Sequence, residues 1–134
     1  MSVISFVQYR VWFFVANGRN VILQWLTDTG AEPADYAALQ SLIDICEYSG
    51  PDALAFCTLD LGEGLYALKS FRKGGYDLSP IFCRGPFSDT EVTFLAGARI
   101  ENKRLKPRYA AGIAAENLDE LIKNPRRRRR ERIG

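Results

Sequence analysis

The chain has 134 residues, the size of one domain, and no apolar run in it approaches the roughly 20 residues of a membrane span. Because it has no histidine and only three scattered cysteines, a disulfide framework, a conventional zinc site and a histidine-based catalytic triad are all unexpected. Residues 1–98 hold 6 Lys and Arg against 11 Asp and Glu, but residues 99–134 hold 12 against 5, an asymmetry that favours a polyanionic partner such as nucleic acid.

The N-terminal half of the chain predicts one strand followed by two helices. Residues 3–16 are rich in Val, Ile, Phe, Tyr and Trp, which favours a strand. The segment 20–30 places its large apolar residues, Trp25 among them, on one helical face. In the segment 34–50 the apolar residues recur at the spacing of a single buried helical stripe.

The second half predicts strands and then a last helix. Two extended arms around Gly74-Gly75 indicate a hairpin. Residues 81–84 and 91–96 predict two further short strands, joined by a turn that contains Gly and Pro. A helix over 108–124 should then follow, with Pro107 suited to its first position and Tyr109 on its inner, apolar face.

This order of elements predicts an α+β domain. We expect an antiparallel sheet of about four strands, with two N-terminal helices and a C-terminal helix packed on it. The domain should span residues 1–124. Residues 125–134, which contain five consecutive arginines, should form a basic, flexible tail that either contacts nucleic acid or only aids solubility.

Motifs for phosphate-binding loops and for nucleophile elbows are missing from the sequence. The neighbouring carboxylates of Asp60 and Glu63, and of Asp119 and Glu120, fit a solvated loop and an outer helix face better than an acid–base pair. No metal and no cofactor is expected. Any site chemistry should therefore depend on basic residues and tyrosine.

Basic residues gather in two places. Lys69, Arg72 and Lys73 lie beside the predicted hairpin, where they can serve either a site or merely the solubility of an edge strand. Five more cations fall within 99–108, just before the last helix, whose N-terminus also attracts anions. If the strands are neighbours, Lys69, Arg72 and Arg99 should converge on one sheet face and hold a phosphate.

Three segments in this order carry a resemblance to a known family: GRNVILQWL in the first helix, GLYALK before the hairpin, and VTFLAGARIENKRLKP before the last helix. The arrangement resembles the RelE/HigB superfamily, and more closely its phage-derived branch of small toxins. The resemblance implies a RelE-like fold and the toxin of a type II toxin–antitoxin system. Such a toxin is a metal-independent, cytoplasmic endoribonuclease that cleaves mRNA, often on the ribosome, and is inhibited by a cognate antitoxin protein.

The resemblance also implies site residues. Lys69 and Arg99 stand at two basic positions of the family pattern, Lys103 lies in the cationic loop, and Tyr109 lies near a late tyrosine, which makes these four the candidate catalytic residues. The candidate RNA-binding residues are Arg72, Lys73, Arg84, Arg104, Lys106 and Arg108.

Two positions depart from the family pattern. Ala67 replaces a charged residue, and the family's arginine is replaced by Pro80 in one alignment and by Asp77 in the other. A second hypothesis therefore stays open: a non-catalytic binding module of the same fold, which uses its basic C-terminal region for nucleic acid or for an acidic partner protein.

Overall fold

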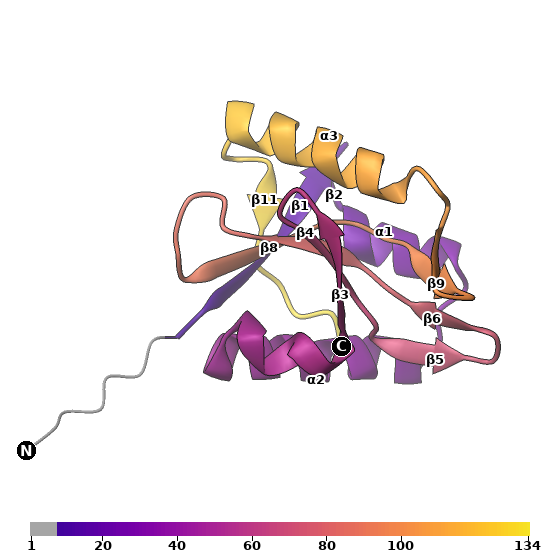
Figure 1. Cartoon of the computed structure of the whole chain (residues 1–134). Coiled ribbons are helices and arrows are strands. Elements are labelled where there is room, and N and C mark those ends of the chain that lie inside the picture. Colours follow the sequence, from indigo (N-terminus) through magenta and orange to yellow (C-terminus); the bar gives the residue numbers. More distant parts are fainter. Residues whose placement is uncertain (1–7) are drawn as a thin grey trace, which may run out of the picture.

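The computed structural model describes residues 8–134 and contains, within that part, helices on both sides of a large sheet and a second, smaller sheet (Figure 1). The helices are α1 (Val21–Asp28), α2 (Pro33–Ser49), the 3₁₀ helix η1 (Pro51–Cys57) and α3 (Ala110–Lys123). None of these helices is long and apolar enough to cross a bilayer.

The strands form two separate sheets. The larger contains β1 (Arg10–Ala16), β2 (Arg19–Asn20), β3 (Thr58–Gly62), β4 (Leu65–Leu68), β7 (Ile81–Arg84), β8 (Glu91–Ala96) and β11 (Arg128–Arg129). The smaller contains β5 (Phe71–Lys73), β6 (Tyr76–Leu78), β9 (Arg99–Glu101) and β10 (Arg104–Lys106). The orders are β11-β1-β8-β7-β4-β3, with β2 beside β1, and β10-β9-β6-β5.

The α+β class predicted from the sequence is confirmed, but the sheet differs from the four antiparallel strands expected. The larger sheet has seven strands and is mixed, because β1 and β8 pair in parallel while its other pairs are antiparallel. The smaller sheet has four strands, two of which, β9 and β10, were not predicted. They pair because Asn102 and Lys103 both take positive φ angles (51° and 62°) and turn the chain back on itself.

Several predicted elements agree with the structure. The two N-terminal helices, the 71–78 hairpin and the strands at 81–84 and 91–96 are all present. The first strand is described from Arg10, and residues 3–7 of that prediction lie outside the described part of the chain. The last helix begins at Ala110 rather than near 108, because Lys106 belongs to β10 and the Ala110 amide closes a turn onto the Pro107 carbonyl at 3.0 Å.

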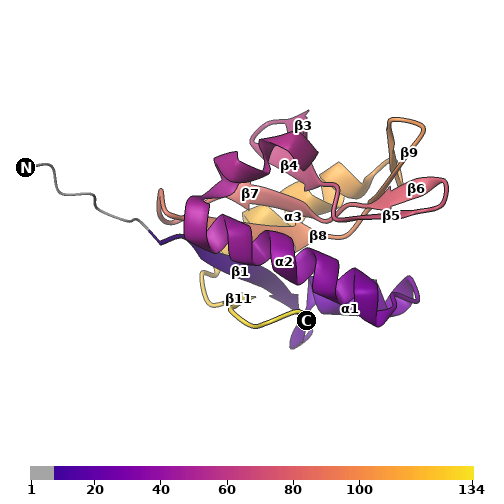
Figure 2. The same ribbon diagram turned by 90° about the horizontal axis from the view of Figure 1, so that it is seen from below.

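The hydrophobic core lies on both faces of the larger sheet, with α1 and α2 over one face and α3 over the other (Figures 1 and 2). Consecutive residues of β1 show the division: Phe13 packs with Leu39 and Ile43 of α2, whereas Phe14 belongs to the cluster under Leu121 of α3. This alternation follows from the pleat of a strand that is buried on both sides.

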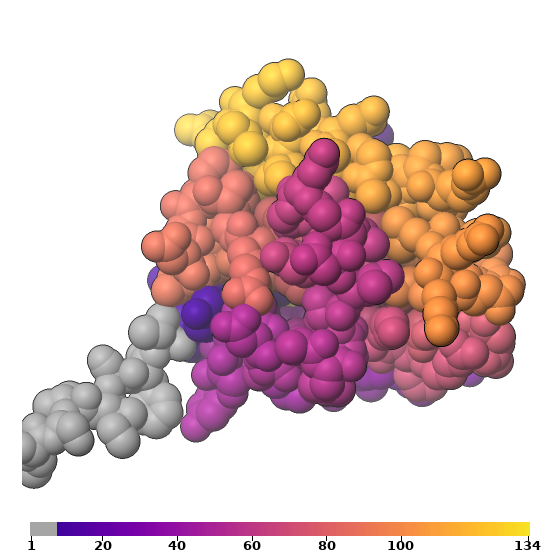
Figure 3. All heavy atoms as spheres, in the orientation of Figure 1, coloured from indigo at the N-terminus to yellow at the C-terminus, as the bar shows by residue number. Residues whose placement is uncertain are grey.

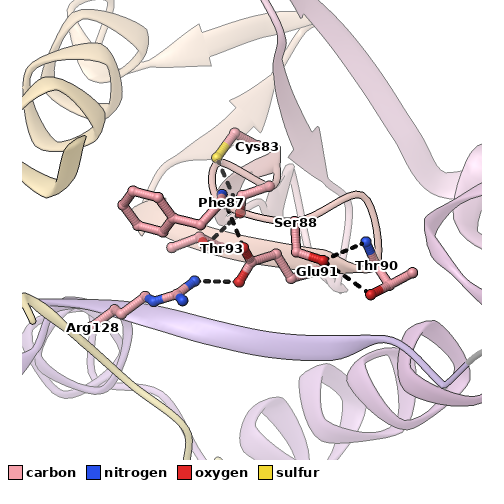
Figure 4. Close-up of polar contacts among 8 residues, drawn as sticks. Cys83, Phe87, Ser88, Thr90, Glu91, Thr93 and Arg128 are labelled. Carbon is pink, nitrogen blue, oxygen red and sulfur yellow. Dashed lines mark hydrogen bonds and ion pairs between the residues drawn. The ribbon is translucent and has the colours of Figure 1, made fainter. Parts of the chain in front are cut away.

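The C-terminal segment differs from the flexible tail expected. β11 pairs with β1, and Ile133 is 6% exposed in the cluster beneath α2. Arg128 forms an ion pair with the buried Glu91 (Figure 4) and lies 3.9 Å from the centroid of the Trp12 ring. One apolar residue near the end, Ile133, and one buried carboxylate, Glu91, hold the segment in place. Five consecutive arginines do not indicate either contact in the sequence.

Candidate nucleic-acid interface

Two connected hollows form a cleft between α1 and α3, which we call the α1–α3 cleft. Its basic end, about 580 Å³, is bordered by the smaller sheet and the start of α3. Its inner end, about 640 Å³, continues between the two helices along the end of β8. Both ends are lined by Trp25, Gly97 and Ile113, so the two hollows form one surface.

The floor of the cleft is fixed by a contact between Trp25 and Gly97. A Cβ atom at position 97 would lie 2.0 Å from Trp25 Cγ, so only glycine lets the indole lie against the backbone there. α1, which carries this indole, begins at an N-cap where the Asn20 side chain accepts hydrogen bonds from the amides of Ile22 (2.9 Å) and Leu23 (3.3 Å). The sequence predicted Trp25 on the apolar face of this helix; the indole does pack against the core cluster, but it also borders the cleft, which the sequence did not indicate.

The basic end of the cleft contains three of the predicted site residues, Arg99, Lys106 and Tyr109. Arg99 and Lys106 are register partners on β9 and β10, which places both side chains on the same face of the smaller sheet. Arg99 lies 5.0 Å from the centroid of the Tyr76 ring and 3.7 Å from a Glu101 carboxylate oxygen. These contacts hold a guanidinium whose side chain is still half exposed.

Tyr109 lies at the N-cap of α3 and is 68% exposed, not on the buried stripe of the helix as predicted. The reason is the later start of α3, since the buried positions of the helix begin with Ala110 and Ala114. Its phenol group therefore borders the same hollow as the two cations.

The remaining cations of the 99–108 segment extend from the cleft onto the surface (Figure 3, orange, beside the 71–78 hairpin). Lys103 is at the turn between β9 and β10, and Arg104 and Arg108 are also exposed. Within residues 8–134, no carboxylate forms an ion pair with Lys103, Arg104, Lys106 or Arg108. We call Arg99 and these four residues the 99–108 cluster. Its positive charge is almost uncompensated.

The expected convergence of Lys69, Arg72 and Arg99 is not found. The register of β5, β6 and β9 puts Arg72 on the face of the smaller sheet opposite Arg99, where it pairs with Asp77 at 3.2 Å. Lys69 does not line the cleft. It lies close to Cys57, because its backbone amide donates a hydrogen bond to the Cys57 carbonyl at 2.8 Å. Burial raises the pKa of the Cys57 thiol, and the Lys69 charge offsets part of that shift.

Two other predicted RNA-binding residues have partners within the protein. Lys73 donates to Asp35 at 2.9 Å, a carboxylate that is 1% exposed, and so ties the hairpin to α2. This hydrogen bond, together with the negative charge of Asp35, raises the pKa of Lys73. Arg84 pairs with Asp52 at 2.5 Å beside Tyr66, in a different hollow from the cleft.

Comparison of the chain with protein families, with curated proteins and with solved structures finds no match. The geometry of the site offers two cations and a phenol at one end of an elongated cleft, an indole on its floor, and further cations around its rim. Cations at fixed positions beside an aromatic surface are the elements with which proteins hold single-stranded RNA.

Proposed function

We propose that this protein binds RNA along the 99–108 cluster and cleaves it at the basic end of the α1–α3 cleft, as the toxin of a type II toxin–antitoxin system. The observation that carries the proposal is the meeting of Arg99, Lys106 and Tyr109 in one hollow, next to cations that no carboxylate of the described residues neutralises. The phosphate groups of RNA carry the negative charge that would neutralise these cations.

The proposed reaction uses the 2′-hydroxyl of the RNA as the nucleophile. Attack of the 2′-oxygen on the adjacent phosphorus forms a 2′,3′-cyclic phosphate and breaks the bond to the 5′-oxygen, which leaves with a proton. Arg99 would bind the non-bridging oxygens, where negative charge grows in the transition state. Lys106 and Tyr109 would carry the two proton transfers, because both line the same hollow, whereas the ring of Tyr76, which also lines it, lies against the Arg99 guanidinium.

The order of the central strands supports the RelE-like part of this proposal. β1, β8, β7 and β4 are consecutive neighbours, and α1 and α2 lie between β1 and β4 in the sequence. We propose that these four strands correspond to the sheet of the RelE/HigB toxins, and that β3 and β11 extend it at its two edges. mRNA, the ribosome and an antitoxin would then be the partners of a protein that acts in the cytoplasm.

The cleavage proposal is tested with purified protein and end-labelled mRNA, with and without ribosomes. We expect products with a 2′,3′-cyclic phosphate and a 5′-hydroxyl. Arg99→Ala should lower the cleavage rate about 100-fold, the effect of removing one preorganised donor to a developing oxyanion. Arg126→Ala is the matched control, since Arg126 is an exposed arginine that does not line the cleft and should leave the rate unchanged. Cleavage that is equally fast in Arg99→Ala would contradict this site.

A second candidate function is favoured by the position of Lys69. Lys69, one of the four candidate catalytic residues, lies outside the cleft, so the protein would bind RNA without cutting it. In that case the purified protein would retain an mRNA that stays intact with and without ribosomes, and Arg99→Ala would weaken retention only. The same assay therefore separates the two functions.

A further inference from the structure

We propose that the inner end of the α1–α3 cleft is a nucleobase subsite, in which one unstacked base of the bound RNA stacks against Trp25. This inference rests on the proposed function, because it assumes that a phosphate of the same RNA lies at the basic end. The larger hollow, which is lined by none of the residues of the 99–108 cluster, would hold the base.

The continuity of the cleft supports the subsite. Trp25, Gly97 and Ile113 border both ends, so a ligand held at Arg99 and Lys106 meets the indole on its way into the inner end. The indole is fixed in place, because its ring rests on the Gly97 backbone and packs against the core cluster beneath α2. A rigid, partly exposed aromatic ring loses little conformational entropy when a base stacks on it.

The lining of the inner end has the composition of a small-ligand site. Val21, Ala96 and Ile113 supply apolar surface, and its volume of about 640 Å³ falls within the range of typical ligand pockets. A flat aromatic heterocycle fits such a lining better than a phosphate does, since Arg19, the cation that lines it, already donates to Gln24 and a carboxylate, Asp28, lines it as well.

Polar groups at the rim can read the edge of a base. Arg19 donates to Gln24 at 2.8 Å, and Gln24 donates in turn to Asp28 at 2.8 Å, which fixes the orientation of the Gln24 amide. On the opposite side Asn117 donates to the Leu95 carbonyl at 2.8 Å, and no described residue donates to its side-chain oxygen. Fixed donors and acceptors around an apolar floor provide selectivity among bases, in addition to the stacking.

The test compares two hexamers that carry equal phosphate charge. One is 2′-O-methyl hexaadenylate, which lacks the 2′-hydroxyl nucleophile and cannot be cleaved, and the other has an abasic sugar at every position. In a Trp12→Phe background, Trp25 is the remaining tryptophan of the chain. We expect hexaadenylate to quench its fluorescence and the abasic hexamer to leave it unchanged. Hexaadenylate should also bind at least about tenfold more tightly, within the range that base–aromatic stacking supplies.

A matched pair of substitutions on α3 separates the subsite from general effects on the helix. Ile113→Trp should fill the inner end and abolish the preference for hexaadenylate, without weakening binding of the abasic hexamer more than twofold. Ile122→Trp is the control and should leave the preference intact, because Ile122 is 53% exposed on the same helix but does not line the cleft. Both sites are partly exposed, so the fold should tolerate the substitutions, which circular dichroism and a thermal melt would check.

The outcomes distinguish the subsite from the function on which it rests. Equal binding of the two hexamers, with both still weakened by Arg99→Ala and Lys106→Ala, would overturn the subsite and leave the proposed RNA interface intact. The subsite would also be overturned if Trp25 fluorescence did not respond to hexaadenylate. Binding of hexaadenylate that is indifferent to Arg99→Ala and Lys106→Ala would overturn the proposed interface as well.

Discussion

The 99–108 cluster and the C-terminal segment 126–132 have similar positive charge in the sequence and opposite roles in the structure. The first has five cations and a single ion pair, between Arg99 and Glu101. In the second, five of six arginines have a carboxylate of the protein within 4.0 Å: Arg127 with Glu120, Arg128 with Glu91, Arg129 with Glu131, Arg130 with Glu47 and Arg132 with Asp44. Charge density along a chain is therefore not the same as charge available to a ligand.

The source of the neutralising carboxylates explains the difference. Asp44 and Glu47 are on α2 and Glu91 is on β8, all within the acidic first 98 residues. The C-terminal segment crosses the acidic body, whereas the 99–108 cluster projects from the molecule on a short hairpin. Folding therefore neutralises part of the charge asymmetry between the two regions of the sequence. The ion pairs of the C-terminal segment therefore stabilise the fold, whereas the 99–108 cluster is the region for which we propose RNA binding.

The largest expected effect tests the structural role of the C-terminal segment. Arg128→Ala leaves Glu91, which is 4% exposed, without its cationic partner, and breaking a buried pair in this way costs about 3–5 kcal/mol. We expect the free energy of unfolding to fall by that amount in urea titrations followed by circular dichroism. The loss includes the contact of the guanidinium with the Trp12 and Phe87 rings.

Two further variants sharpen this prediction. Replacing both partners, as in Glu91→Gln with Arg128→Met, should restore part of the loss, because no buried charge is then left unpaired. Arg126→Ala should change the free energy of unfolding by less than about 0.5 kcal/mol, as expected for an exposed side chain without an ion pair among the described residues. A stability loss in Arg126→Ala equal to that in Arg128→Ala would contradict the structural role assigned to the pair.

RNA affinity provides the second test of the comparison. Joint replacement of Lys103, Arg104, Lys106 and Arg108 by alanine should weaken binding of single-stranded RNA about 100-fold at low salt and reduce the salt slope of log K by about 3, at about 0.7 per lost phosphate contact. Fluorescence anisotropy across a salt series measures both quantities. The unfolding free energy should stay near that of the wild type, because these side chains have no ion pairs within residues 8–134.

The matched control removes the same type of charge from the other region. Joint replacement of Arg126, Arg129 and Arg130 by alanine should weaken RNA binding less than about threefold, since two of these arginines already have carboxylate partners. If the control lost as much affinity and salt dependence as the cluster variant, the surface ion pairs would be opening to RNA. The division between a binding region and a stabilising region would then fail.

The third prediction concerns the last apolar side chain of the chain. Ile133 is 6% exposed in the cluster with Leu39 and Ile43, and its amide donates to the Gln40 side-chain oxygen at 2.5 Å. Ile133→Ala should lower the free energy of unfolding by about 2 kcal/mol, at the low end for a buried isoleucine because a chain end can relax around the cavity. A variant that melts like the wild type would show that residues 131–134 contribute nothing to the core.

The elements that were predictable from the sequence are those with a strong local pattern. The helical stripe of 34–50 and the apolar strands at 81–84 and 91–96 have the spacing of their secondary structure, and the structure contains them. β9 and β10 were missed because Asn102-Lys103 is an unusual turn sequence, with a non-glycine residue at positive φ in both places. β11 was missed because two arginines have no strand pattern, and their pairing depends on contacts with distant residues.

The candidate site was predictable only in part for the same reason. Basic residue type and proximity to a helix start pointed to Arg99 and Lys106, and the family resemblance pointed to Tyr109; the structure brings all three to one hollow. Whether Arg72 shares their face depends on strand register, which short strands in a sequence do not define. The place of Trp25 in the cleft was missed because an aromatic residue on an apolar helical stripe is ordinarily core, and its position on the cleft floor depends on Gly97, more than 70 positions along the chain.

The smallest expected effect is a pH dependence at Lys73, a cation that the sequence assigned to RNA and that the structure ties to Asp35. The hydrogen bond to Asp35 raises the pKa of Lys73 above its ordinary value of 10.5, so the folded protein holds this proton more tightly than the unfolded chain does. The resulting stabilisation is complete below pH 10.5 and is lost as the pH rises through the higher, folded pKa.

Burial also raises the pKa values of Cys46, to about 12, and Cys83, to about 11, so the thiols add a loss of stability of the same sign at high pH. Lys73→Met retains the thiols, and the difference between its unfolding curve and that of the wild type should therefore shrink above pH 10.5. A difference that stays constant from pH 7 through that range would show that Lys73 has no such bond, and would return it to the set of cations available for RNA.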